Sequence, residues 1–151
     1  PEIVTNHRRV KSELTNANFF VYLTVSALNA FYLPESLMTF LEERMVARDV
    51  DFDLNIVRGP NHLRLGIFDM KERAALARKF ESFISKIEGH LDPALEAKIA
   101  RELRAVLASI PPEVLIEDRA EFKKSTIQLD RLRSERFGVA FPELFALLYE
   151  G

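Results

Sequence analysis

The spacing of hydrophobic residues divides the chain near residue 70. Before that point, residues 19–28 are almost continuously apolar and rich in β-branched and aromatic side chains, which predicts a strand buried on both faces of a parallel sheet. Residues 51–57 alternate between polar and apolar, which predicts a second strand. Between them, Pro34 and apolar residues at helical spacing predict a helix that reaches about residue 47. A strand, a helix and a strand in this order predict a right-handed βαβ unit.

The second half of the chain has apolar residues at every third or fourth position, which predicts helices only. The first helix ends at Gly89, and the next begins at Asp92-Pro93, an N-cap residue followed by proline at the first helical position. A third helix is predicted from about 118 to 136, ended by Gly138. A last short helix is predicted over about 142–149.

We therefore expect a mixed α/β chain in two parts. Residues 1–69 form the sheet-bearing part, with a further short extended piece over residues 63–68. Residues 70–151 form a helical tail that has to pack on another element to bury its apolar faces.

The composition removes several classes of function. The 151 residues include no cysteine, which excludes disulfides, thiolate metal ligands and cysteine nucleophiles. The net charge of −2 gives no electrostatic argument for binding nucleic acid or an anionic membrane. No apolar run reaches the roughly 20 residues of a membrane span, and the polar N-terminus has no signal-peptide core, so we expect a cytoplasmic protein. The chain begins with proline, which suggests processing, truncation or a segment of a longer polypeptide.

Polar residues gather where the two predicted strands end. Thr24, Ser26 and Asn29 belong to the end of the first strand, and Asn55 and Arg58 to the end of the second. Ligands of parallel α/β folds bind at the carboxyl ends of the strands, so these five residues are the candidate binding site. The alternative for the asparagines is that they satisfy neighbouring backbone groups. Arg58 is either a ligand for a carboxylate or phosphate or a solvated charge.

The alternation of the second strand assigns its two faces. Phe52, Leu54 and Ile56 suit a face that packs against helices, which leaves Asp53, Asn55 and Val57 on the other face. A polar inner face is typical of a barrel that holds a ligand.

No catalytic residue and no metal ligand is predicted. His7, His62 and His90 lack metal-ligand spacing, and only His62 lies near the candidate edge, where it could serve as a general acid or base. Asp130 and Arg133 are three positions apart on the third tail helix, either as a solvated ion pair or as part of a docking surface.

Three motifs in a fixed order resemble a known superfamily. Residues 24–29 match T-V-S-x-x-N, residues 54–60 match L-N-x-V-x-G-P, and residues 126–144 match a tail of the form T-x-x-L-D-x-x-R followed by F and F-P-E-L. Together they resemble the closing half of the radical S-adenosylmethionine (radical SAM) partial barrel, in the branch with a shortened twitch or SPASM-like region.

The resemblance implies the last strands and helices of a partial (β/α) barrel followed by a helical C-terminal tail. The full-length family protein uses S-adenosylmethionine and a [4Fe–4S] cluster to generate a 5′-deoxyadenosyl radical that abstracts hydrogen from its substrate. The cluster is held by a CxxxCxxC loop that this cysteine-free chain lacks, so the chain alone is expected to ligate no cofactor and to be non-catalytic. Thr24, Ser26, Asn29, Asn55 and Arg58 would lie near SAM or substrate. Relatives with this tail include peptide-modifying enzymes, so the resemblance implies a peptide or protein as a plausible substrate.

The expected partner is the missing N-terminal barrel half or another protein chain. A second hypothesis is a non-catalytic α/β-helical binding or assembly module, because an incomplete sheet needs a partner to cover its edge. A third is an isolated domain that binds a nucleotide without turnover, for which no phosphate-binding fingerprint exists in the sequence.

Overall fold

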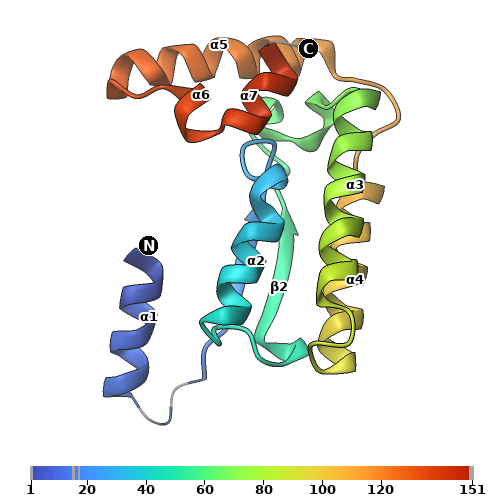
Figure 1. Cartoon of the computed structure of the whole chain (residues 1–151). Coiled ribbons are helices and arrows are strands. Elements are labelled where there is room, and N and C mark those ends of the chain that lie inside the picture. The colour runs from blue at the N-terminus through green and yellow to red at the C-terminus, as the bar shows by residue number, and fades with distance from the viewer. Residues whose placement is uncertain (1, 15, 17, 150–151) are drawn as a thin grey trace.

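The computed structural model of the chain describes residues 2–14, 16 and 18–149. Over these residues the protein is mixed α/β and mostly helical, with one parallel sheet of two strands (Figure 1). The helices and strands, in chain order, are α1 (Glu2–Glu13), β1 (Val21–Val25), α2 (Leu33–Glu42), β2 (Phe52–Ile56), α3 (Met70–Ile87), α4 (Pro93–Ala108), α5 (Ile116–Arg133), α6 (Phe137–Ala140) and α7 (Pro142–Tyr149). Four short 3₁₀ turns complete the fold, namely η1 (Ala30–Tyr32), η2 (Asp49–Asp51), η3 (Asn61–Leu63) and η4 (Leu65–Ile67).

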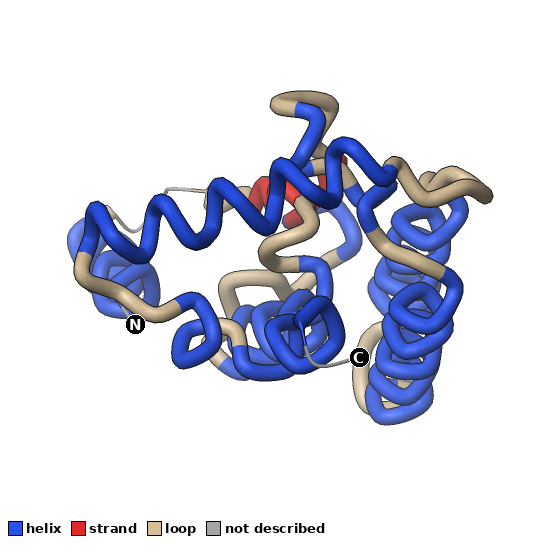
Figure 2. Tube along the Cα trace, turned by 90° about the horizontal axis from the view of Figure 1, so that it is seen from above, coloured by secondary structure: helices blue, strands red, loops and turns tan. Residues whose placement is uncertain are grey.

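The sheet has one covered face and one open face. β1 and β2 run parallel in a register from Val21 opposite Phe52 to Val25 opposite Ile56, with α2 as the connection, which confirms the predicted strand–helix–strand order. α2 lies in front of the sheet (Figures 1 and 2). Tyr22, on the open face, is 61% exposed, whereas Val25, on the covered face, is fully buried.

The prediction of a strand buried on both faces over residues 19–28 was therefore wrong. The strand covers only Val21–Val25, and its burial alternates along most of its length. Its apolar composition predicted two covered faces because a central strand of a larger sheet has the same pattern. In the described part of the chain only β2 pairs with it, and the helices cover one side.

α2 ends sooner than its apolar pattern predicted. The helix stops at Glu42 and not near residue 47. The backbone N–H groups of Met45 and Val46 both donate to the carbonyl oxygen of Phe40, and Arg44 has a left-handed φ of 52°. Met45 is still buried, because this turn folds it back onto the core. The spacing of Met45 thus indicated burial correctly and helix length wrongly.

The extended piece predicted over residues 63–68 is replaced by η3 and η4. Leu65 and Ile67 are buried there, and the carbonyl oxygen of Gly66 accepts a hydrogen bond of 2.9 Å from the N–H of Leu115. A side chain at Gly66 would meet Leu115 Cδ1 at 2.7 Å, so the close approach of the two segments favours glycine.

The helix boundaries of the tail follow its local signals, with one exception. Asp92 accepts hydrogen bonds from the first turn of α4, and Gly89 has a φ of 74° just beyond α3, as predicted. α7 spans the predicted residues 142–149. α5, in contrast, ends at Arg133 because Ser134 adopts a left-handed φ of 55°, whereas Gly138 lies inside α6.

α5 lies across the carboxyl-terminal end of the sheet. It packs on η3 and η4, the two turns that follow β2, and spans the top of the molecule in Figure 1. α3 and α4 pack side by side next to β2, and α6 and α7 return beneath α5 (Figures 1 and 2). In the described ranges no helix has the length and apolar character needed to cross a membrane.

Candidate functional site at the strand ends

A side-chain clasp closes the end of β1. Asn29 Nδ2 donates to the carbonyl oxygen of Thr24 at 2.8 Å, and Asn29 Oδ1 accepts from the N–H of Ser26 at 2.8 Å. The two bonds use both ends of the amide to hold the turn that follows the strand. The structure therefore brings Thr24, Ser26 and Asn29 together. Asn29 satisfies neighbouring backbone groups, which is the alternative to ligand binding that the sequence also predicted.

The open face of the sheet carries polar and aromatic side chains. Thr24 lies opposite Asn55 in the register, and both are exposed. Toward the start of β1, the rings of Phe20 and Tyr22 stack with centroids 6.3 Å apart and are 54% and 61% exposed. Because in-register residues of parallel strands share a face, Thr24 and Asn55 form one polar surface with these aromatic rings at its lower end.

Asp53 of β2 is held from the side by α4. Lys98 forms an ion pair with the Asp53 carboxylate and lies over the Phe52 ring, with its Nζ 5.6 Å from the ring centroid. Lys98 is largely buried, so this cation joins α4 to β2 and leaves Asp53 less accessible to a ligand than Asn55.

Two arginines follow β2. Arg64 Nε donates to the carbonyl oxygen of Arg58 at 2.8 Å, which fixes the Arg64 guanidinium over the loop. Neither guanidinium forms an ion pair with any residue that the structure describes. Two arginines of one loop without acidic partners among the described residues favour an anionic ligand, and guanidinium groups bind carboxylates and phosphates with two hydrogen bonds.

A hollow of about 320 Å³ lies beside this loop at the end of β2. Arg64 and Ser109 contribute its polar groups, and no carboxylate is among the described residues that line it. Its apolar walls come from Ile56, Val57, Leu65, Pro111 and Leu115. The sequence did not predict this hollow, because Ser109 and Leu115 come from the connection between α4 and α5 and only long-range packing brings them to β2.

α5 is fixed over the strand ends by a buried ion pair. Arg119 donates to both carboxylate oxygens of Glu72, at 2.6 and 2.7 Å, and to the carbonyl oxygen of Ile67 at 2.9 Å. Glu72 is only 1% exposed and also accepts the N–H of Asp69. The hydrogen bonds that Arg119 donates to Glu72 raise the pKa of Arg119, which keeps the guanidinium charged. This ion pair thus holds α5, which covers the site, to the start of α3.

The exposed Arg58 belongs to this site, and the remaining candidates lie in neighbouring segments. His62 is half-buried in η3. Asp130 accepts the N–H of Phe137 at 2.8 Å, so it fixes α6 and does not pair with Arg133 within the described ranges. No cluster of three or more histidine, aspartate or glutamate side chains that could hold a metal ion exists in the described part of the chain.

No protein-family model, curated protein or solved structure matches this chain. The candidate site therefore stands on its geometry: an open polar sheet face, two arginines without acidic partners and a hollow at the carboxyl ends of parallel strands.

Proposed function

We propose that this chain is the C-terminal portion of a radical SAM enzyme, in which β1 and β2 are closing strands of a partial (β/α) barrel and the helical tail covers the mouth. One observation carries the proposal. The sheet has a face packed by helices and an opposite face that exposes Thr24 and Asn55. A barrel strand has such a helix-covered outer face, and a polar inner face suits a barrel that encloses a ligand.

In this proposal the open face and the adjoining loop form part of the SAM pocket. Thr24 and Asn55 would bind hydroxyl or amide groups, and the Arg58 guanidinium would bind a carboxylate. Asn29 and Ser26 act as positioning residues, because their hydrogen bonds fix the turn that ends β1. Bound SAM supplies the radical that abstracts hydrogen from the substrate, and the tail motif supports a peptide or protein as that substrate.

The residues present do not fit the iron–sulfur cluster. The chain has no cysteine, and the family holds its cluster through three cysteines of a CxxxCxxC loop. The proposal therefore requires that this loop comes from a preceding segment or from another chain, which would also supply the strands next to β1.

The test is to isolate the protein anaerobically from its source and to measure its intact mass, iron content and SAM cleavage. The proposal is supported if three results occur together. The protein has a mass above 17.4 kDa or a stable partner, it carries a bound cluster, and it forms 5′-deoxyadenosine. An iron-free particle that contains every natural partner would overturn it.

Variants of the open face then test the site assignment. Thr24→Val and Asn55→Ala are expected to weaken SAM binding about tenfold each, the cost of one good hydrogen bond. Thr5→Val, at an exposed position of α1, is the matched control and should leave binding unchanged.

A second candidate function, a non-catalytic assembly module, is favoured by the aromatic pair on the open face. Phe20 and Tyr22 expose more than half of their surface on one side of a two-stranded sheet. Such side chains are typical of a surface that another protein covers. The same isolation separates the two functions, because a stable iron-free complex that loses its partner on Tyr22→Ala identifies the module.

A further inference from the structure

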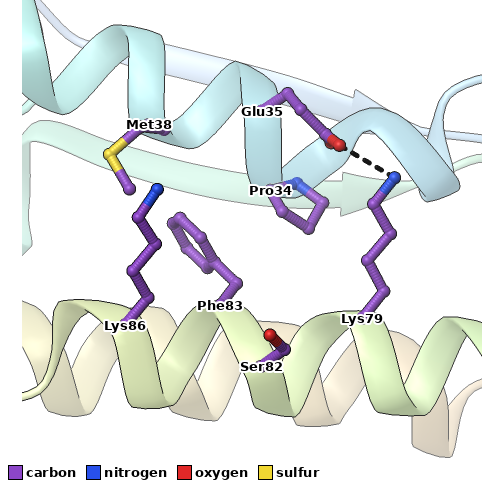
Figure 3. A pocket seen from close by; sticks show the side chains of 7 residues that line it. All are labelled: Pro34, Glu35, Met38, Lys79, Ser82, Phe83 and Lys86. Atoms are coloured by element: carbon purple, nitrogen blue, oxygen red, sulfur yellow. Dashed lines mark ion pairs between the residues drawn. The ribbon is translucent and has the colours of Figure 1, made fainter.

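A second site lies on the outer surface, in the groove between α2 and α3 (Figure 3). The groove has a volume of about 330 Å³, near the lower end of the range for small-molecule sites. It is separate from the strand ends and does not depend on the proposed function. Pro34 and Met38 of α2 and Phe83 of α3 form an apolar floor.

The two ends of the groove differ in charge. At one end Lys79 Nζ contacts Glu35 at 2.8 Å and Glu143 at 2.5 Å and lies 5.3 Å from the centroid of the Tyr32 ring. Burial lowers the pKa of Lys79, but the hydrogen bonds to Glu143 and Glu35 outweigh it and raise the pKa above its ordinary value. Lys79 is thus a charged structural link with its donors in use, and this end of the groove carries one excess negative charge.

The other end carries an unused cation. Lys86 extends from α3 toward Met38, and Ser82 lies one turn before it on the same helix (Figure 3). In the ranges that the structure describes, neither side chain has a hydrogen bond or ion pair with another residue. Ser82 lies between Lys79 and Lys86 along α3, which leaves Lys86 as the cation at this end of the groove (Figure 3).

We propose that this groove binds a small carboxylate with an apolar body. The body would lie on Met38 and Phe83, and the carboxylate would accept a hydrogen bond from the Lys86 ammonium. The excess negative charge beside Lys79 directs the carboxylate to the Lys86 end, seven residues or about 10 Å away along α3. An aromatic ring with a short carboxylate arm matches this combination of apolar floor and terminal cation.

The chain offers a direct reporter of binding. It contains three methionines, and their ε-methyl groups give separate NMR signals. Met38 lies in the groove, Met45 is buried elsewhere, and Met70 is 84% exposed at the start of α3 outside the groove. Titration with 3-phenylpropionate should therefore shift the Met38 methyl signal saturably, with a dissociation constant of about 1 mM, while Met45 and Met70 stay in place.

Two controls test the chemistry of the interaction. The neutral amide of the same compound should bind at least about tenfold more weakly, and Lys86→Glu should weaken binding of the carboxylate by a similar factor. Lys71→Glu, at an exposed lysine of the same helix outside the groove, should leave the dissociation constant unchanged. The inference is wrong if the amide binds equally well, if Lys86→Glu has no effect, or if Met70 shifts together with Met38.

Discussion

Arg119 of α5 donates hydrogen bonds to both carboxylate oxygens of Glu72 in α3, and these two residues, 47 positions apart, hold the helical tail over the ends of the strands. Glu72 also closes the capping box with Asp69 that begins α3. One buried carboxylate thus fixes both the start of a helix and the position of another helix. Arg119 is the ion-pair partner of this buried carboxylate in the described part of the chain.

Replacing Arg119 with methionine is expected to lower the free energy of unfolding by about 3 kcal/mol, because it leaves the Glu72 carboxylate buried without a cation. Urea unfolding followed by circular dichroism measures the change. Arg104→Met is the control, since the Arg104–Glu81 ion pair is exposed, and it should leave the midpoint almost unchanged. Equal midpoints for the two variants would contradict the role assigned to Glu72.

Gly66→Ala should destabilise the protein by about 1–3 kcal/mol, the usual cost of overpacking. The added methyl group would lie 2.7 Å from Leu115 Cδ1 and 3.0 Å from Pro111 Cγ. Gly59→Ala is the matched control, because nothing lies within 4 Å of a side chain there. If the clash with Leu115 is the cause, Leu115→Ala in the Gly66→Ala background should recover part of the loss, and thermal unfolding would show it.

Asn29→Ala should loosen the end of β1. The substitution removes the hydrogen bonds to Ser26 and Thr24, at a net cost of about 1 kcal/mol. Amide hydrogen exchange at Ser26 and Ala27 should become faster, while exchange in α3 stays the same. Asn61→Ala, at an exposed asparagine of η3, provides the comparison. Unchanged exchange at Ser26 would mean that the clasp does not hold the turn.

The stability of the protein should fall as the pH drops below 6.5. Burial, and after it the charge of Lys11, lower the pKa of His7 below that value. As the pH falls below about 6.5, His7 of the unfolded chain takes up a proton before His7 of the folded chain does. This difference in proton uptake favours unfolding. The contribution of His7 to stability is fully present above the pKa of the unfolded chain and is lost as the pH falls from there through the lower pKa of the folded chain.

His7→Leu removes this titration and keeps a side chain of similar size against the Phe19 ring, which lies 4.8 Å from the imidazole. Urea unfolding at pH about 7.5 and about 5 should show a smaller loss of stability for the variant than for the parent. The same loss in both proteins would exclude His7 as a source of the pH dependence.

The sequence alone determined the features that depend on neighbouring residues. Asp92 and Pro93 begin α4, Gly89 follows the end of α3, and α7 lies where a short last helix was predicted, over about 142–149. Each of these signals acts within one turn of helix, through a side chain that bonds to its own backbone or a residue that permits an unusual φ. The parallel strand–helix–strand order was predictable for a similar reason, since chain connectivity and hydrophobic period limit the possible arrangements.

Only the tertiary structure decided which surfaces are covered and which polar groups meet. The apolar pattern of β1 is the same whether one or two faces are buried, so only the packing of the described fold decides that Tyr22 is exposed. Likewise, the partners Glu72 and Arg119, and the hollow between β2 and Leu115, join segments far apart in sequence. Packing sets these distances, and no local periodicity encodes them.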